Sequence, residues 1–502
     1  MQKNFKKLNI INLQSGDKYF GDVKILKKTI PGPIIFSISD GYGVMDAVIK
    51  DSNFNVDDVV KISGKVSERA GKLQIELESI KKSDIDFEAL IDKNSEPQNT
   101  NFSIKSEKLE KLKPYFFNIS KRIRKAILEN QPLIIRHHAD SDGINAGLAI
   151  EHSSRMLMEK IGLNPEFNLY RSPSRAPFYE IIDVLKDVSF SKKTLEAHGQ
   201  KKPLFIVLDN GSTPEDVFGL KTLKILGFES IVIDHHNPVI IDNKKTLVDP
   251  YLSFHLNPYI EGFDSQICAG MLAYELAKWI FKDFNNPAMP AVAALTDRSN
   301  SKEADQYIEK SQRTKKELEE IGIAIDFIAY QLKFAPGKGL FEELYKNPEL
   351  VKILNQEVRK GTKTQLESTL PYLRTRDISG VILSDIDLEK YTMKFKYPTP
   401  GKVIGMIHDT VSAGREEMPI ITLGYLSDMI ILRATRPVLP IAKIIERIKQ
   451  DVTHAGTEGG GHECAGTIKF TPGHLTAILE NIKKQISELN YLENSQELKN
   501  RD

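Results

Sequence analysis

The sequence predicts an α/β protein: a doubly wound parallel-sheet domain, a smaller α/β domain after it and a β-barrel before it. Three observations support this fold class. Short β-rich segments separated by turn sequences fill residues 8–83, and continuous apolar runs alternate with helical segments over 131–300. A second mixture of strands and helices covers 376–490. Continuous rather than alternating apolar runs are typical of strands covered on both faces, as in parallel sheets.

The N-terminal segment carries five short runs rich in β-branched residues, with PGP and SDGYG among the turns between them. The expected strands are Phe20–Lys28, Ile34–Ser39, Gly43–Lys50, Asp57–Val66 and Lys72–Ile80. Five short strands favour a small Greek-key barrel, so we assign residues 1–90 to an OB-like nucleic-acid-binding barrel. Phe36, Tyr42 and Phe54 are candidate base-stacking platforms, with core packing as the alternative for each.

The remaining chain is divided by changes in pattern. The parallel-sheet domain contains the runs PLIIR, PLFIVLD and SIVIDHH, and the segment after it is rich in Lys and Glu. We expect a linker and a helix over 91–130, the parallel-sheet domain over 131–300, a helical connection over 301–375, the second α/β domain over 376–490 and a tail over 491–502.

Composition excludes several classes. Lys plus Arg number 69 and Asp plus Glu 68, so the net charge of +1 gives no global attraction to nucleic acid, and such binding requires local patches. Two cysteines do not make a disulfide framework, which favours a reducing cytoplasm. No apolar run reaches the ~20 residues of a membrane span, so we expect a cytoplasmic protein without membrane contact.

Acidic and histidine residues follow the ends of the predicted strands. They are His137, His138, Asp140 and Asp142 after the first run, Asp209 after the second, Asp234, His235 and His236 after the third, and Asp297 further on. In open parallel sheets, ligands bind beyond the carboxyl ends of the strands. We therefore expect these segments to meet in one crevice.

Such a cluster favours divalent cations. Neighbouring carboxylates repel one another and cannot all stay ionised unaided. Carboxylates with imidazoles suit Mn²⁺ or Mg²⁺, and His favours Mn²⁺. An Asp-x-Asp spacing reaches two neighbouring metals and an Asp from the next strand can bridge them, which suits two-metal hydrolysis of a phosphoryl group.

These motifs resemble a known family. HxDxDG at 138–143, VLDNG at 207–211, DHH at 234–236 and Asp297 within ALTDRS resemble the four motifs of the DHH phosphoesterase superfamily. GGGHECAG at 459–466 resembles the signature of the DHHA1 domain, and RATR at 433–436 the strand that precedes it. With an OB-like domain in front, the chain looks most like archaeal RecJ-like single-strand-specific exonucleases.

The resemblance implies a role for each matching residue. The metal ligands, for two Mn²⁺ or Mg²⁺ ions, would be His138, Asp140, Asp142, Asp209, Asp234, His235 and Asp297. Asp209 would bridge the ions, Asp234 would orient the His pair, and His236 would face the scissile phosphate. A substrate phosphate or terminal nucleotide would be held by Arg436, Gly459, Gly460, Gly461 and His462.

The sequence departs from the family at one position. Many members carry a His four residues before the first Asp, where this chain has Arg136. His138 is therefore the candidate ligand, and we expect His137 on the opposite pleat. The segment RSPSRAP at 171–177 could line the substrate path, with a plain surface loop as the alternative.

The function expected from these features is a metal-dependent exonuclease that hydrolyses single-stranded DNA or RNA to mononucleotides. Two alternatives stay open: a phosphodiesterase acting on short oligonucleotides or cyclic dinucleotides, and a scaffold in a replication complex. Replication or repair proteins are possible partners, with 301–375 as a docking surface.

Overall fold

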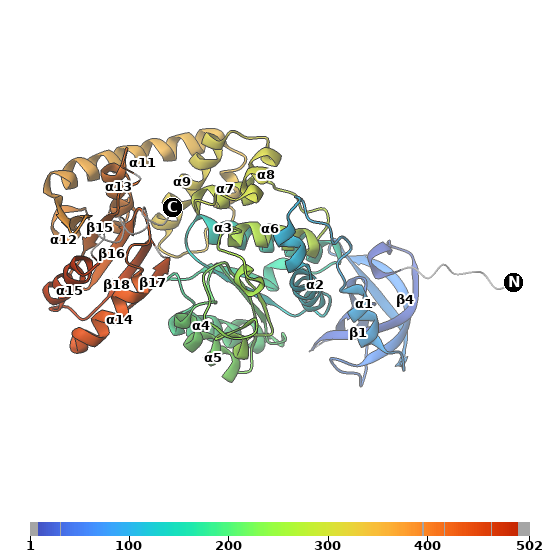
Figure 1. Ribbon diagram of the computed structural model, residues 1–502. Coiled ribbons are helices and arrows are strands. Elements are labelled where there is room, and N and C mark those ends of the chain that lie inside the picture. Colours follow the sequence, from blue (N-terminus) through green and yellow to red (C-terminus); the bar gives the residue numbers. More distant parts are fainter. Residues whose placement is uncertain (1–8, 31, 394–395, 416, 463, 490–502) are drawn as a thin grey trace. The chain divides into compact units, whose positions relative to one another are not determined.

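The computed structural model describes residues 9–30, 32–393, 396–415, 417–462 and 464–489 (Figure 1). The side chains of His198 and His462 and the expected tail at 491–502 lie outside the described part. The chain forms two compact units, Met1–Pro348 and Glu349–Asp502. None of the described helices is long and apolar enough to cross a membrane.

A closed five-stranded barrel begins the first unit. Its strands are β1 (Lys18–Thr29), β2 (Ile34–Ser39), β3 (Val44–Ile49), β4 (Val59–Arg69) and β5 (Lys72–Lys82). They are ordered β1-β2-β3-β5-β4, with β3 parallel to β5, which fits the expected OB-like barrel. Phe36 is fully buried in the barrel core and Phe54 packs against that core, so core packing is the correct interpretation of both, whereas Tyr42 is 43% exposed.

The barrel is attached to the rest of its unit by polar contacts. The backbone N–H of Val44 donates to the carbonyl of Ile161 at 2.6 Å. Lys24, on β1, forms an ion pair with Glu88 of α1 (Phe87–Asn94) at 2.7 Å. Asn94, at the end of that helix, donates to the carbonyl of Gly41 at 2.9 Å.

A five-stranded parallel sheet forms the centre of the first unit. Its strands, in the order β12-β9-β8-β6-β7, are β12 (Phe254–Leu256), β9 (Glu229–Ile233), β8 (Leu204–Leu208), β6 (Leu133–His137) and β7 (Leu169–Pro173). Helices α3 (Ser141–Lys160) and α6 (Ala269–Ile280) lie on one side, and α4 (Ile181–Phe190) and α5 (Val217–Ile225) on the other (Figure 1). Helices on both faces explain the continuous apolar runs and confirm the doubly wound fold class.

Further helices and a hairpin complete the first unit. Ser106 begins the long helix α2 (Glu107–Leu128) by accepting a hydrogen bond from the N–H of Leu109. The other elements are β10 (Ile240–Asp242), β11 (Lys245–Thr246), α7 (Ala288–Thr296), α8 (Lys302–Ser311), α9 (Lys315–Leu332) and α10 (Leu340–Glu343). Helix α11 (Pro348–Thr369) follows them into the second unit.

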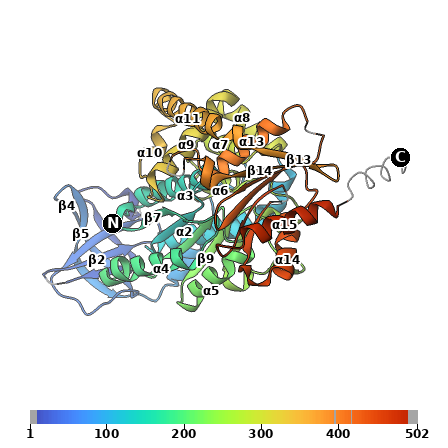
Figure 2. The ribbon, with the colours of Figure 1, turned by 90° about the vertical axis from the view of Figure 1, so that its left-hand side faces the viewer.

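The second unit contains a six-stranded mixed sheet in the order β13-β14-β15-β16-β18-β17. Figure 2 labels β13 and β14 of this sheet together with helices α14 and α15. The strands are β13 (Arg374–Ile378), β14 (Val381–Asp387), β15 (Ile420–Tyr425), β16 (Met429–Ala434), β17 (Glu458–His462) and β18 (Ala465–Lys469). The helices are α12 (Leu388–Tyr391), α13 (Pro400–Ser412), α14 (Ile441–Asp451) and α15 (Leu475–Ser487). Mixed strands and helices place this unit in the expected α/β class.

Candidate metal centre

Asp209 lies at the centre of the polar cluster. It follows β8 with a backbone φ of 56°, a left-handed conformation that is uncommon for residues other than glycine. Its side chain is 2% exposed, and neither carboxylate oxygen has a hydrogen-bond partner within the described part of the chain. Its Oδ2 lies 3.4 Å from Nδ1 of His138, and its Oδ1 lies 3.3 Å from Nε2 of His235. A buried carboxylate without a donor is costly unless a cation balances it.

Two groups of side chains share Asp209. His138, Asp140 and Asp209 form one group, and Asp209, His235 and His236 form the other; within each group the ligand atoms lie within 4.8 Å of one another. Each group could hold a metal ion. Their shared carboxylate is the arrangement expected of a bridging ligand between two ions.

Asp140 is fixed by two contacts. It begins α3, where its Oδ1 accepts a hydrogen bond from the N–H of Gly143 at 3.0 Å. Its Oδ2 lies 3.0 Å from Nδ1 of His138. Burial opposes ionisation, but His138 holds the pKa of the Asp140 carboxyl well below its usual range. The carboxylate is therefore ionised and directed toward the cluster.

The two histidines of the DHH sequence are oriented by fixed acceptors. His235 Nδ1 lies 2.9 Å from the carbonyl oxygen of Ser265, so this nitrogen carries a proton and Nε2, which faces Asp209, is the candidate ligand atom. His236 Nδ1 lies 2.7 Å from Oδ1 of Asp234. Both rings therefore have a defined orientation.

Asp234 is fully buried behind the His pair. Its Oδ1 accepts hydrogen bonds from the backbone N–H groups of His235 and His236, and its Oδ2 accepts one from Ser212. Burial alone would favour the neutral acid, but His236 and these donors hold the pKa of Asp234 well below its usual range. Asp234 thus orients the histidines and does not belong to either of the two ligand groups.

Asp142 and Asp297 border the cluster without joining those groups. Asp142 accepts hydrogen bonds from the N–H groups of Ala269 and Gly270 at the start of α6, and its Oδ2 lies 3.7 Å from His235 Nε2. Asp297 Oδ2 lies 3.7 Å from His235 Nδ1. Burial raises the pKa of Asp297 to about 6, helped by repulsion from Asp209 and opposed by attraction to His235.

His137 and Arg136 point away from the cluster. His137 is fully buried, and its Nε2 lies 3.0 Å from Nη1 of Arg171; burial and that guanidinium hold the pKa of His137 well below its usual range. Arg136 pairs with Asp187 and donates to the carbonyl of Pro173. Both side chains therefore have partners outside the two ligand groups, and of the two adjacent histidines His138, which directly follows β6, is the one that reaches Asp209.

The segment RSPSRAP does not present Arg171 to a substrate. Arg171 is buried on β7, where its Nε donates to Glu151 at 2.5 Å. Arg171 therefore joins β7 to α3, and the role of the rest of the segment, substrate path or plain surface loop, stays a prediction. Arg175, in the same segment, is exposed.

Sequence reasoning missed a hydrogen-bonded network of polar side chains behind the DHH segment. Ser212 Oγ lies 2.9 Å from His255 Nε2, and His255 Nδ1 lies 2.7 Å from Asp249 Oδ1. Asn257 donates both to Ser212 Oγ and to the carbonyl of His236. This network contacts Asp234 through Ser212 and His236 through Asn257. Its residues come from separate segments and do not form a recognisable sequence motif.

The expected phosphate-binding residues lie in the second unit. Gly459, Gly460 and Gly461 form β17, and Arg436 Nη2 lies 3.1 Å from Glu417 Oε2. A Cβ on Gly459 or Gly461 would lie 2.1 or 2.3 Å from a carbonyl oxygen of β18, so both positions require glycine. The side chain of His462 lies outside the described part.

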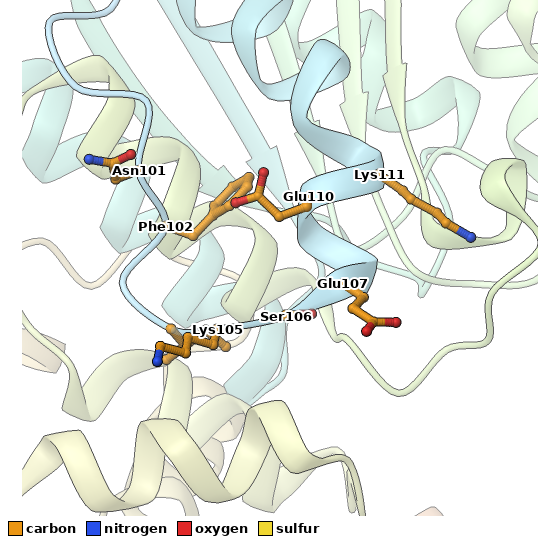
Figure 3. A pocket seen from close by; sticks show the side chains of 8 residues that line it. Asn101, Phe102, Lys105, Ser106, Glu107, Glu110 and Lys111 are labelled. Atoms are coloured by element: carbon orange, nitrogen blue, oxygen red, sulfur yellow. The ribbon is translucent and has the colours of Figure 1, made fainter.

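A pocket of about 620 Å³ lies elsewhere, at the start of α2 (Figure 3). Its lining contains none of the candidate ligands: Asn101, Phe102, Ile104, Lys105, Ser106, Glu107, Glu110 and Lys111. Two lysines and two glutamates give it no net charge. We place the candidate site at the Asp209 cluster, where carboxylates and imidazoles converge.

Comparison with known proteins identifies the family of this chain. A family model described as the DHH family, N-terminal domain, matches residues 132–297. The solved structure of the DHH domain of a member of the s1p family of ribosomal proteins is 37% identical, with a TM-score of 0.77, and the match covers 80% of this chain and 97% of that one. This chain therefore belongs to the DHH family, a family of metal-dependent phosphoesterases.

Two further relatives differ in how much they resemble this chain. An uncharacterized protein of Methanocaldococcus jannaschii is 36% identical over 504 residues, covering 90% of this chain and 66% of the relative, so this chain spans about two thirds of that protein. RecJ in complex with Mn²⁺ from Thermus thermophilus is 14% identical, with a TM-score of 0.49, covering 78% of this chain and 56% of that one. The second similarity is too low to transfer a function.

Proposed function

We propose that this protein is an exonuclease that hydrolyses single-stranded DNA or RNA to mononucleotides with two divalent cations, Mn²⁺ or Mg²⁺. The observation that carries the proposal is Asp209, a buried carboxylate without a hydrogen-bond donor in the described part of the chain that is shared by two ligand groups. Two bound cations would activate a water molecule and neutralise charge on the phosphate.

The side chains around this centre have separate roles. His138, Asp140 and His235 hold the cations with Asp209, and Asp142 and Asp297 border them. His236 belongs to the second ligand group, but Asp234 holds its Nδ1, so we assign this side chain to a phosphate oxygen or to the leaving group and not to a cation. In the second unit, we assign a substrate phosphate or terminal nucleotide to Arg436, the three glycines of β17 and His462.

The barrel favours a polymeric substrate over a dinucleotide. An OB-like barrel binds single strands by stacking and backbone contacts, and a two-nucleotide substrate does not need it. A RecJ-like exonuclease therefore suits this architecture better than a cyclic dinucleotide phosphodiesterase does.

The experiment uses 5′- and 3′-labelled single-stranded DNA and RNA 20-mers with Mn²⁺, Mg²⁺ or EDTA. We expect metal-dependent release of mononucleotides, abolished in Asp209→Asn and retained in Asp242→Asn, an exposed aspartate on the β10–β11 hairpin. Asn is chosen because it tolerates the left-handed backbone of Asp209. Absence of cleavage of every 20-mer in both metals would overturn the proposal, and dinucleotides in the same buffer would then test the alternative substrate.

A further inference from the structure

Basic residues are unevenly distributed around the barrel. Strands β2 (IIFSIS) and β3 (VMDAVI) contain no Lys or Arg, whereas β1, β4 and β5 carry all the basic residues of the barrel strands. Strands β2 and β3 form the usual binding face of an OB fold. Here the start of β3 is also occupied, because Val44 bonds to Ile161 and its carbonyl lies against Gly162.

The outer surface of β1, β4 and β5 presents an exposed aromatic ring among lysines. Phe20 is 64% exposed, while its neighbour Tyr19 is buried. We call this surface the basic face and define it by Lys18, Phe20, Lys61, Lys65 and Lys81. In the strand register, Lys18 lies opposite Lys65 and Lys61 opposite Lys81, so the lysines surround the ring.

The lysines of the basic face are available to a ligand. All four are exposed, and none of them forms an ion pair within 4.0 Å among the described residues. Lys61 lies 5.1 Å from the centre of the Phe20 ring. Asp22 and Glu76 share the face, opposite Lys61 and Lys65 in the register, and they accept hydrogen bonds from Ser83 at 2.8 Å and Ser67 at 2.9 Å. The four lysines outnumber these two carboxylates, so the face keeps a positive net charge.

We propose that the basic face binds single-stranded nucleic acid, with a base stacked on Phe20 and phosphates on the lysines. Charge complementarity selects a polyanion, and the exposed ring selects one with unpaired bases, because bases in a duplex are already stacked. This inference rests on the proposed function and adds a binding surface to it. It also departs from the β2–β3 face that OB folds usually employ.

The test is binding of fluorescein-labelled 20-mers of deoxythymidine and of uridine to the full chain in EDTA, followed by anisotropy. Phe20→Ala is expected to weaken binding about 5- to 100-fold, and Phe20→Trp to retain it. Phe218→Ala is the matched control, because Phe218 is also 64% exposed but lies on α5. Lys61→Gln with Lys65→Gln should reduce the slope of log K against log salt by about 1.4.

The outcomes separate this inference from the proposed function. If Phe20→Ala binds both 20-mers within twofold of the wild type, the basic face is not the binding surface. If a 20-residue polyglutamate competes as well as the oligonucleotides do, the face binds acidic protein and the inference also fails. Loss of binding in Phe20→Ala supports it even where the wild type cleaves nothing in Mn²⁺, a result that overturns the nuclease alone.

Discussion

The left-handed backbone of Asp209 restricts which substitutions test its role. Asn tolerates a φ of 56° and keeps the size of the side chain, so Asp209→Asn should fold as the wild type does. At a Mn²⁺ concentration of ~100 times its Kd, ligand binding should stabilise the wild type by about 2.7 kcal/mol. Asp209→Asn should gain less than about 1 kcal/mol, because the carboxylate charge that both ligand groups share is lost.

Urea unfolding with EDTA and with Mn²⁺ measures both quantities. Asp242→Asn, on the exposed hairpin, should retain the full gain. An equal Mn²⁺ gain in Asp209→Asn and in the wild type would exclude Asp209 as a ligand.

The raised pKa of Asp297 predicts how metal affinity depends on pH. Its pKa is raised to about 6 in the metal-free protein, so the carboxyl binds a proton below that pH. A cation that uses this carboxylate must then displace the proton, and affinity should fall by up to tenfold per pH unit for this group below pH 6. Mn²⁺ titrations by calorimetry between pH 5 and 8 check this. Asp297→Asn should bind more weakly at pH 7.5 and show a shallower decline.

The close packing of α6 on α7 reverses the usual effect of a glycine substitution. Gly→Ala inside a helix normally stabilises by ~1 kcal/mol. At Gly270, however, a Cβ would lie 2.4 Å from Cβ of Ala293 and 2.8 Å from Oδ1 of Asp142. Gly270→Ala should therefore destabilise the protein by about 1–3 kcal/mol and weaken Mn²⁺ binding, because both neighbours must move.

Gly405 provides the control for that prediction. It lies in α13, and a Cβ there meets no atom within 4 Å. Gly405→Ala should be neutral or stabilising in the same urea experiment. Similar stability changes for the two variants would show that the α6–α7 approach has no energetic effect.

At the level of elements, the pattern of apolar residues predicted the central strands, but it did not predict the side-chain contacts around the site. The apolar runs predicted β6, β8 and β9 to within one or two residues, because strands buried on both faces must be apolar throughout. The site residues at their ends follow from that geometry. The hydrogen bonds that link Ser212 to His255 and His255 to Asp249 could not be predicted, since they depend on loop conformations that no local pattern specifies.

The sequence also could not predict which aromatic side chains of the barrel are buried. Tyr19 and Phe20 are adjacent, so strand alternation buries one and exposes the other, but their chemistry does not say which. Phe36 was an equally reasonable surface candidate from sequence and lies in the core. Side-chain direction was set by the register of β1 against β4, a pairing between strands that lie far apart in sequence.

The two units should respond differently to metal. Every candidate ligand lies in Met1–Pro348, so Mn²⁺ should slow hydrogen exchange in that unit, most of all in β8, β9 and the first turns of α3 and α6. Exchange in β14–β16 of the second unit should be unchanged by Mn²⁺ without nucleic acid. Mass spectrometry of exchanged full-length protein, with Asp209→Asn in parallel, tests this. Equal protection of both units would place a ligand outside the first.

The spacing of the candidate ligands along the chain sets the time between their synthesis on the ribosome. About 160 residues separate His138 from Asp297, which at ~5–20 residues per second corresponds to roughly 8–30 s of translation. The barrel, whose five strands end at Lys82, can close well before then. The candidate ligands therefore leave the ribosome after the barrel sequence, and a metal site that needs Asp297 could form only after that residue has emerged.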